Sequence, residues 1–131
     1  MAKWNIPDFP LDQVESQSKE LARLRESDIN RIAAEAYANS VAKGFWDLGE
    51  NRNQGEMIAL MHSELSEALE AIRKPQESEK IPGFTLLEEE MADLIIRAGD
   101  FAAGFKLQLV EAISAKMKYN ESRPHKHGKR F

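Results

Sequence analysis

Apolar residues recur at steps of three and four along most of this chain, and this spacing constrains the fold more than any other feature of the sequence. The period matches the 3.6-residue turn of an α-helix. No segment of useful length alternates apolar and polar residues as a half-buried strand would. The sequence therefore predicts an all-α fold, most simply a bundle of four to five helices.

Capping residues, glycines and prolines divide the periodic sequence into predicted helices. Two starts carry the spacing of a capping box, in which a polar side chain precedes a glutamate by three residues: Asn53 with Glu56, and Thr85 with Glu88. The predicted helices are a patchy one across Leu11 to Leu24, one between a Ser27 cap and Gly49, one from the Asn53 cap to about Arg73, one from the Thr85 cap to about Ala103, and one from about Leu107 to Asn120.

Composition narrows the class of protein. A length of 131 residues suits one domain, divided here into an N-terminal extension with a helical pattern over 1–26 and a helical domain over 27–131. The chain has no cysteine, no apolar run long enough for a membrane span and no apolar signal core at its start, which predicts a cytoplasmic protein without membrane contact. A net charge of −4 argues against a nucleic-acid surface.

The charge is uneven along the chain. From Lys116 to Phe131 there are six lysines or arginines and one acid, Glu121, so the rest is more acidic than the total. An acidic body with a basic end would suit a metal–phosphate site. An ordinary solvated tail has the same composition, so both interpretations stay open.

The third predicted helix carries a carboxylate inside its apolar face. On a helical wheel Glu64 lies between Leu60, one turn before it, and Ala68, one turn after it, and Glu67 lies at the edge of the same arc. An isolated ionised carboxylate in an apolar face is costly unless its pKa rises or a cation binds it. The position of Glu64 therefore indicates a metal ligand.

The fourth predicted helix repeats the pattern, with Glu90 and Asp93 three residues apart beside its apolar arc, and Arg97 and Asp100 on the same stripe. If the two helices pack antiparallel, four carboxylates converge, and oxygen ligands suit Mg²⁺, with Mn²⁺ as the alternative. Acidic residues also flank the apolar arc of ordinary amphipathic helices and favour a first helical turn, so solvated carboxylates are the competing interpretation.

At these residues the sequence resembles the MazG family of all-α nucleoside triphosphate pyrophosphohydrolases, whose signature is Glu-Glu-x-x-Glu followed, after a spacer, by Glu-x-x-Asp. Here the blocks read Ser63-Glu64-Leu65-Ser66-Glu67 and Glu90-Met91-Ala92-Asp93. The likeness covers about residues 28–130 and includes Gly44-Phe45-Trp46, Ile81-Pro82-Gly83-Phe84 and the segment from Lys118 to Lys129. One position departs from the signature, because Ser63 stands where the family has its first Glu.

The resemblance implies a role for individual residues. Glu64, Glu67, Glu90 and Asp93 would bind Mg²⁺, and Glu64 and Glu67 would also activate water. Arg97 would orient a carboxylate or contact phosphate, with a salt bridge to Asp93 or Asp100 as the purely structural alternative. Trp46 would stack on the base, with a core or interface aromatic as the equal alternative. Lys116 and Asn120, four residues apart on the last helix, would contact phosphate.

The implied reaction is hydrolysis of the α–β phosphoanhydride of a nucleoside triphosphate, which yields a nucleoside monophosphate and pyrophosphate and serves nucleotide-pool control. The family also implies a homodimer or homotetramer. Two alternatives remain: an enzyme of the same fold acting on a modified nucleotide or phosphoribosyl-ATP, and a non-catalytic helical protein that binds nucleotide or a partner. A phosphate-binding P-loop is excluded, because Glu50-Asn51 follow Gly49 where Lys-Ser/Thr is required.

Overall fold

The computed structural model describes the backbone of residues 14–129, and within this range the side chains of 28–126, 128 and 129. Its α-helices are α1 (Val14–Ala42), α2 (Gln54–Arg73), α3 (Leu86–Gly104) and α4 (Leu109–Glu121), with short 3-10 helices η2 (Gly49–Asn51) and η3 (His125–Gly128). Between residues 14 and 129 the only strand-like pairing is one isolated bridge, between Glu77 and Thr85. The predicted all-α fold is confirmed.

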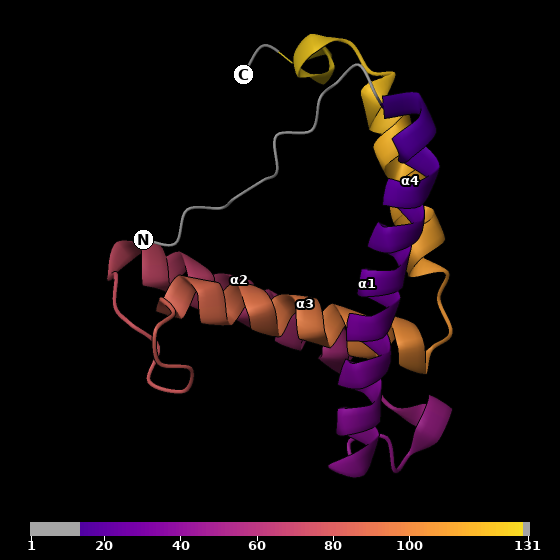
Figure 1. Ribbon diagram of the computed structural model, residues 1–131. Coiled ribbons are helices and arrows are strands. Elements are labelled where there is room, and N and C mark those ends of the chain that lie inside the picture. Colours follow the sequence, from indigo (N-terminus) through magenta and orange to yellow (C-terminus); the bar gives the residue numbers. More distant parts are fainter. Residues whose placement is uncertain (1–13, 130–131) are drawn as a thin grey trace.

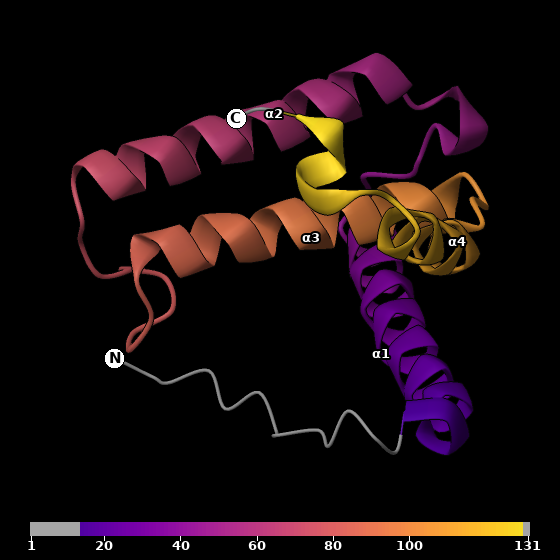
Figure 2. The same cartoon turned by 90° about the horizontal axis from the view of Figure 1, so that it is seen from above.

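α3 is the central element. α3 lies antiparallel beside α2. α1 crosses α3 near the C-terminal end of α3, at a steep angle to the α2–α3 pair (Figures 1 and 2). α4 runs back along α1, away from the α2–α3 pair. None of the helices between residues 14 and 129 is long and apolar enough to cross a membrane.

α1 differs from the prediction at both ends. It is one continuous helix from Val14 to Ala42, so the expected helix start at Ser27 does not occur. No proline or glycine lies between Pro10 and Gly44, and nothing in the sequence forces a break there. The helix ends at Ala42, and the glycine that terminates it is Gly44 rather than Gly49: Gly44 has φ +84°, its N–H donates to Val41 O, and Phe45 N–H donates to Ser40 O. This is the glycine-terminated Schellman motif.

The starts of α2 and α3 are as predicted. Asn53 accepts the backbone N–H of Glu56 at 3.1 Å and caps α2. Thr85 and Glu88 form the full capping box of α3, since the Thr85 hydroxyl accepts Glu88 N–H at 3.2 Å and the Glu88 carboxylate accepts Thr85 N–H at 2.7 Å. These caps set the register of the two helices that carry the predicted ligands. α4 begins two residues later than expected, after Lys106 with φ 57°.

The core lies where α1, α3 and the loop after α1 meet. The buried Trp46 makes edge contacts with the rings of Tyr37 and Phe105, at centroid distances of 5.4 and 5.2 Å. Its indole Nε1–H donates to Asp100 Oδ1 at 2.7 Å, and the Ser40 hydroxyl donates to Asp100 Oδ2 at 2.9 Å. A buried carboxylate is tolerated here because several donors satisfy its oxygens.

Two glycines of α3 permit this close packing. A Cβ atom at Gly99 would lie 3.0 Å from the Cα of Ala33, so Gly99 lets the backbones of α1 and α3 approach each other. A Cβ atom at Gly104 would overlap the ring of Trp46. The missing side chains are therefore what allows α1 and the loop after it to pack on α3.

The loop between α2 and α3 is held by a buried polar contact. The Ser78 hydroxyl donates to the buried Glu89 carboxylate and accepts the backbone N–H groups of Lys80 and Ile81 at 3.2 and 3.0 Å. Lys80 forms an ion pair with Glu89, and these contacts hold the pKa of Glu89 below its usual range. Because Glu89 directly precedes Glu90, these contacts of Glu89 fix the start of α3 beside the predicted ligand Glu90.

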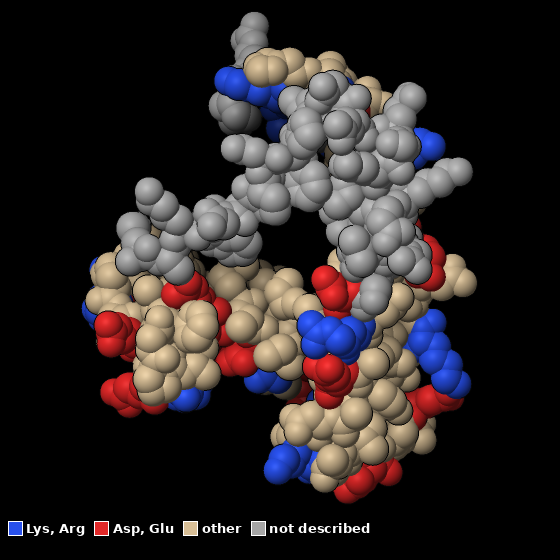
Figure 3. Space-filling model, in the orientation of Figure 1, with Lys and Arg blue, Asp and Glu red and all other residues tan. Residues whose placement is uncertain are grey.

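Only part of the apolar surface of α2 and α3 is buried. On α2, Met57, Ala68 and Ala71 are buried, whereas Leu65, Leu69 and Ile72 are exposed. On α3, Met91, Ile95 and Ile96 are exposed while the buried positions include three acids: Glu89, Glu90 and Asp100. In Figure 3 uncharged side chains cover much of the visible face of the α2–α3 pair. The helix pair therefore buries its acidic edge and leaves an apolar edge in solvent.

Candidate metal centre

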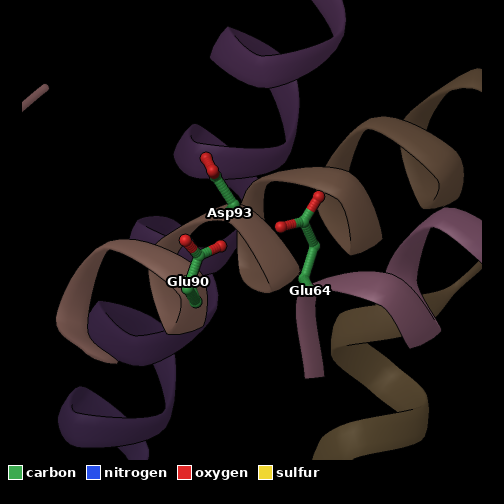
Figure 4. Close-up of side chains that lie close together, drawn as sticks. All are labelled: Glu64, Glu90 and Asp93. Atoms are coloured by element: carbon green, nitrogen blue, oxygen red, sulfur yellow. The ribbon is translucent and has the colours of Figure 1, made fainter. Parts of the chain in front are cut away.

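Three of the four predicted ligands converge between α2 and α3. Glu64 comes from the middle of α2, and Glu90 and Asp93 come from the first half of α3 (Figure 4). One carboxylate oxygen from each residue lies within 4.8 Å of the other two. Glu64 and Glu90 are only 4% and 5% exposed, and Asp93 is half-buried. The carboxylates converge because α2 and α3 pack antiparallel, which was the condition stated from the sequence.

Burial and the neighbouring carboxylates disfavour the ionised form of Glu90 in this cluster. Burial, followed by the neighbouring Glu64 and Glu67 carboxylates, raises the pKa of Glu90 to about 7. A carboxyl group so placed holds a proton at pH values where an exposed glutamate is ionised. A divalent cation among the three oxygens would replace that proton and remove the repulsion, so the donor set fits a hard cation such as Mg²⁺.

Arg97 supplies a positive charge that reaches the cluster. Its Nε–H donates to Glu64 Oε1 at 2.6 Å, and its side chain is 40% exposed. The purely structural alternative paired Arg97 with Asp93 or Asp100, and the structure instead pairs it with Glu64. Arg97 therefore orients a candidate ligand, and this contact joins α3 to α2 beside the site.

Glu67 and Ser63 lie outside the converging set. Glu67 is exposed, and its carboxylate is not among the three oxygens, although its charge contributes to the raised pKa of Glu90. Ser63, which stands where the MazG signature has Glu, is exposed and donates to its own helix at Leu60 O, 2.7 Å away. The departure at Ser63 therefore removes no oxygen from the Glu64–Glu90–Asp93 cluster.

Two of the three residues predicted to contact phosphate do not reach the cluster within one chain. Lys116 and Asn120 are exposed residues of α4, which runs along α1 and leaves the α2–α3 pair (Figure 1). The Lys116 ammonium lies 4.6 Å from the centroid of the Tyr119 ring on the same helix. Wheel analysis could place these two residues on one face of a helix, but the direction of that helix depends on tertiary contacts.

The structure places Trp46 in the core and not on a binding surface. The side chain is 8% exposed, its Nε1–H is bonded to Asp100, and two aromatic rings contact its edges. A base could stack on this ring only if the core opened. The burial and contacts of Trp46 therefore favour the alternative, a core aromatic, over base stacking.

A pocket of about 380 Å³ lies beside the acidic cluster. Its walls come from the loop after α1, the first turns of α2, and Arg97 of α3, and they include the exposed ring of Phe45 and the guanidinium of Arg52. Sequence reasoning missed Arg52. The only available signal was its position between a glycine-containing turn and the Asn53 cap, which places it in a loop but says nothing of its contacts.

Comparison with known proteins does not assign the chain to a family. The chain matches no protein-family model, and no curated protein and no solved structure shows significant similarity to it. Fold and site together define an all-α protein with three carboxylates converging between two antiparallel helices.

Proposed function

We propose that this protein is a Mg²⁺-dependent nucleoside triphosphate pyrophosphohydrolase that cleaves (d)NTP to (d)NMP and pyrophosphate in nucleotide-pool control. The observation that carries the proposal is the convergence of Glu64, Glu90 and Asp93 within 4.8 Å, two of them buried. Stability alone does not account for buried carboxylates that face each other, because they repel and raise a pKa to about 7. The resemblance of these residues to the MazG signature supplies the reaction.

Individual residues of the chain would bind the metal, orient a carboxylate and accept a proton in this reaction. Glu64, Glu90 and Asp93 would hold Mg²⁺, which would supply neutralisation of charge on the phosphates, the chemistry that phosphoryl transfer mostly needs. Arg97 holds the Glu64 carboxylate in place, and a guanidinium has further N–H groups with which to contact a phosphate oxygen. The exposed Glu67 carboxylate, next to the cluster, accepts a proton from the attacking water. The water oxygen then bonds to one of the two phosphorus atoms of the α–β anhydride, the bond from that phosphorus to the bridging oxygen breaks, and nucleoside monophosphate and pyrophosphate leave.

A homo-oligomer is part of this proposal, and the unburied surface supports it. The exposed apolar residues of the α2–α3 pair, Leu65, Leu69, Ile72, Met91, Ile95 and Ile96, offer the area that a second copy would cover.

The reaction is tested with a panel of ribo- and deoxyribonucleoside triphosphates, with and without Mg²⁺, and products resolved by ion-exchange chromatography. We expect monophosphate and pyrophosphate only when Mg²⁺ is present. Glu64→Gln should lower turnover about 100-fold or more, since it removes a ligand oxygen's charge. Glu70→Gln is the matched control, because Glu70 is an exposed acid of the same helix that pairs with Lys74.

Other product patterns would redirect the assignment. Diphosphate with orthophosphate would mean that a different phosphoanhydride is cleaved. Turnover confined to modified nucleotides or phosphoribosyl-ATP would favour the alternative substrate within the same fold. Full activity in a folded Glu64→Gln variant would contradict the proposed role of the cluster. Nucleotide or metal binding without turnover on any substrate would favour a non-catalytic binding protein.

A further inference from the structure

The loop between α2 and α3 brings a lysine to one end of the acidic cluster. Lys80 forms an ion pair with Glu89, whose side chain is 6% exposed and which directly precedes the candidate ligand Glu90. Glu89 and Asp93 are four residues apart on α3 and therefore lie on one face of that helix, one turn apart. The ion pair thus holds the Lys80 ammonium beside the end of the cluster that is nearest the start of α3.

Hydrogen bonds of the backbone close this loop and fix the position of the lysine within it. Ser78 N–H donates to Phe84 O at 2.9 Å, which pairs the two sides of the loop. The buried Ser78 hydroxyl also accepts the backbone N–H of Lys80 at 3.2 Å. Because these contacts do not involve the Lys80 side chain, its ammonium can bind a second anion without opening the loop.

The Lys80 ammonium is positively charged and open to a further acceptor. Its side chain is 75% exposed, and an ammonium has several N–H groups, so the contact with Glu89 leaves room for a second oxygen. The hydrogen bond and the charge of Glu89 raise the pKa of Lys80 above its usual value. The charges of Glu90 and Asp93 add to this rise in pKa, so the ammonium lies within electrostatic reach of both candidate ligands.

Positive charges therefore flank the cluster at both of its ends along α3. Arg97 lies one turn beyond Asp93 and donates to Glu64. Lys80 reaches the other end through Glu89. Glu89 and Arg97 are eight residues apart, which is about 12 Å along the helix axis. A polyphosphate chain that lies over the cluster along this line would meet a cation at each end.

We propose that Lys80 binds the two terminal phosphates of the nucleotide and neutralises negative charge on the pyrophosphate that leaves. The inference rests on the proposed function for its choice of substrate. The two ends of the cluster differ, because Arg97 lines an enclosed pocket whereas Lys80 faces solvent, and hydrated terminal phosphates need no cavity. Lys80 also supplies what Lys116 and Asn120 do not, a phosphate contact beside the cluster within one chain.

The test is isothermal titration of the protein with inorganic pyrophosphate in the presence of Mg²⁺, which needs no turnover. Lys80→Gln should weaken pyrophosphate binding about tenfold, the effect of losing one hydrogen bond from a charged donor. The same variant should leave the affinity for AMP unchanged, because AMP lacks the terminal phosphates. Lys74→Gln is the matched control, since Lys74 is a similarly exposed lysine that pairs with Glu70 on α2.

A separate measurement distinguishes phosphate binding from a purely structural role of Lys80. Lys80→Gln should remain folded, because the Ser78 hydroxyl still donates to Glu89 and the backbone still closes the loop. Thermal unfolding checks this, and Lys80→Met is a second neutral variant. Mn²⁺ affinity should not fall in either variant, since the Glu64, Glu90 and Asp93 oxygens remain in place.

Several results would overturn the role of Lys80. These are unchanged pyrophosphate affinity in the neutral variants, an equal loss in Lys74→Gln, an equal loss of AMP affinity, and no pyrophosphate binding at millimolar concentration. Weakened Mn²⁺ binding in the neutral variants would also overturn it, because Lys80 would then act by holding α3 in place. The hydrolase proposal fails separately: pyrophosphate binding that depends on Lys80, without turnover of any nucleotide, would overturn the reaction and leave the phosphate contact standing.

Discussion

Arg97 donates its Nε–H to Glu64 Oε1 over 2.6 Å and so joins α3 to the carboxylate on α2 that is 4% exposed. The two residues are 33 positions apart in the sequence. Arg97 lines the neighbouring pocket while it donates to Glu64 of the acidic cluster, and a change at Arg97 should therefore affect both the candidate ligand and the pocket.

Arg97→Ala should weaken metal affinity or activity about 10- to 100-fold, the usual effect of removing the residue that orients a ligand. The physical reason is that Glu64 would lose the donor that fixes its carboxylate. Mn²⁺ binding, followed by electron paramagnetic resonance, measures the effect without needing turnover. Arg73→Ala is the control, since Arg73 is an exposed residue of α2 near Glu70; an equal loss in that variant would contradict a specific role for Arg97.

The pH dependence of stability should report on Glu90. Its pKa is raised from 4.5 to about 7 in the folded protein, mainly by burial, so the folded state keeps a proton that the unfolded state releases. The contribution of Glu90 is therefore fully present below pH 4.5 and is lost as the pH rises through about 7. Urea denaturation in EDTA from about pH 5 to about pH 8 should show this decline in the free energy of unfolding.

Glu90→Gln is the control for that titration, because the amide has no proton to lose and mimics the protonated acid. The variant should remove most of the decline across the same pH range. Saturating Mg²⁺ should also reduce the decline in the unsubstituted protein, since a cation replaces the proton in the cluster. A decline of equal slope in Glu90→Gln would assign it to another group.

Asp100→Asn should be strongly destabilising, by about 3 kcal/mol, because it breaks a buried ion pair and leaves Arg52 without its partner. The amide nitrogen introduced by the substitution would also face a donor, since Asp100 accepts from Trp46 Nε1, Ser40 Oγ and Arg52 Nη1. Denaturation followed by tryptophan fluorescence measures the change. A loss below about 1 kcal/mol would mean that the network contributes no more than one ordinary hydrogen bond.

Gly104→Ala should destabilise the protein by about 1–3 kcal/mol through overpacking. The added methyl group would overlap the Trp46 ring, which is already held by Asp100 and by two neighbouring aromatic rings. Thermal unfolding measures the loss, and the emission of the displaced tryptophan should shift with it. An unchanged melting temperature would contradict the close approach of Trp46 to α3.

Local sequence signals predicted the two helices that carry the site. Asn53 and Thr85 cap α2 and α3 as their spacing to Glu56 and Glu88 indicates, because a cap depends only on residues within one turn. The same helical register placed Glu64 inside a buried arc. The start of α1 was predicted wrongly at Ser27, since a residue that favours a cap does not end a helix that already runs through it.

The rest was decided by contacts between residues distant in the sequence. Trp46 is buried because Asp100, 54 residues away, accepts its indole N–H and because Gly104 leaves room for its ring. Arg97 pairs with Glu64 across α2 and α3, and α4 takes Lys116 and Asn120 away from the cluster along α1. Periodicity and capping act over a few residues and determine which helices form. Which edge of each helix is buried, and which charges meet, depends on how those helices pack, and only the tertiary structure contains that information.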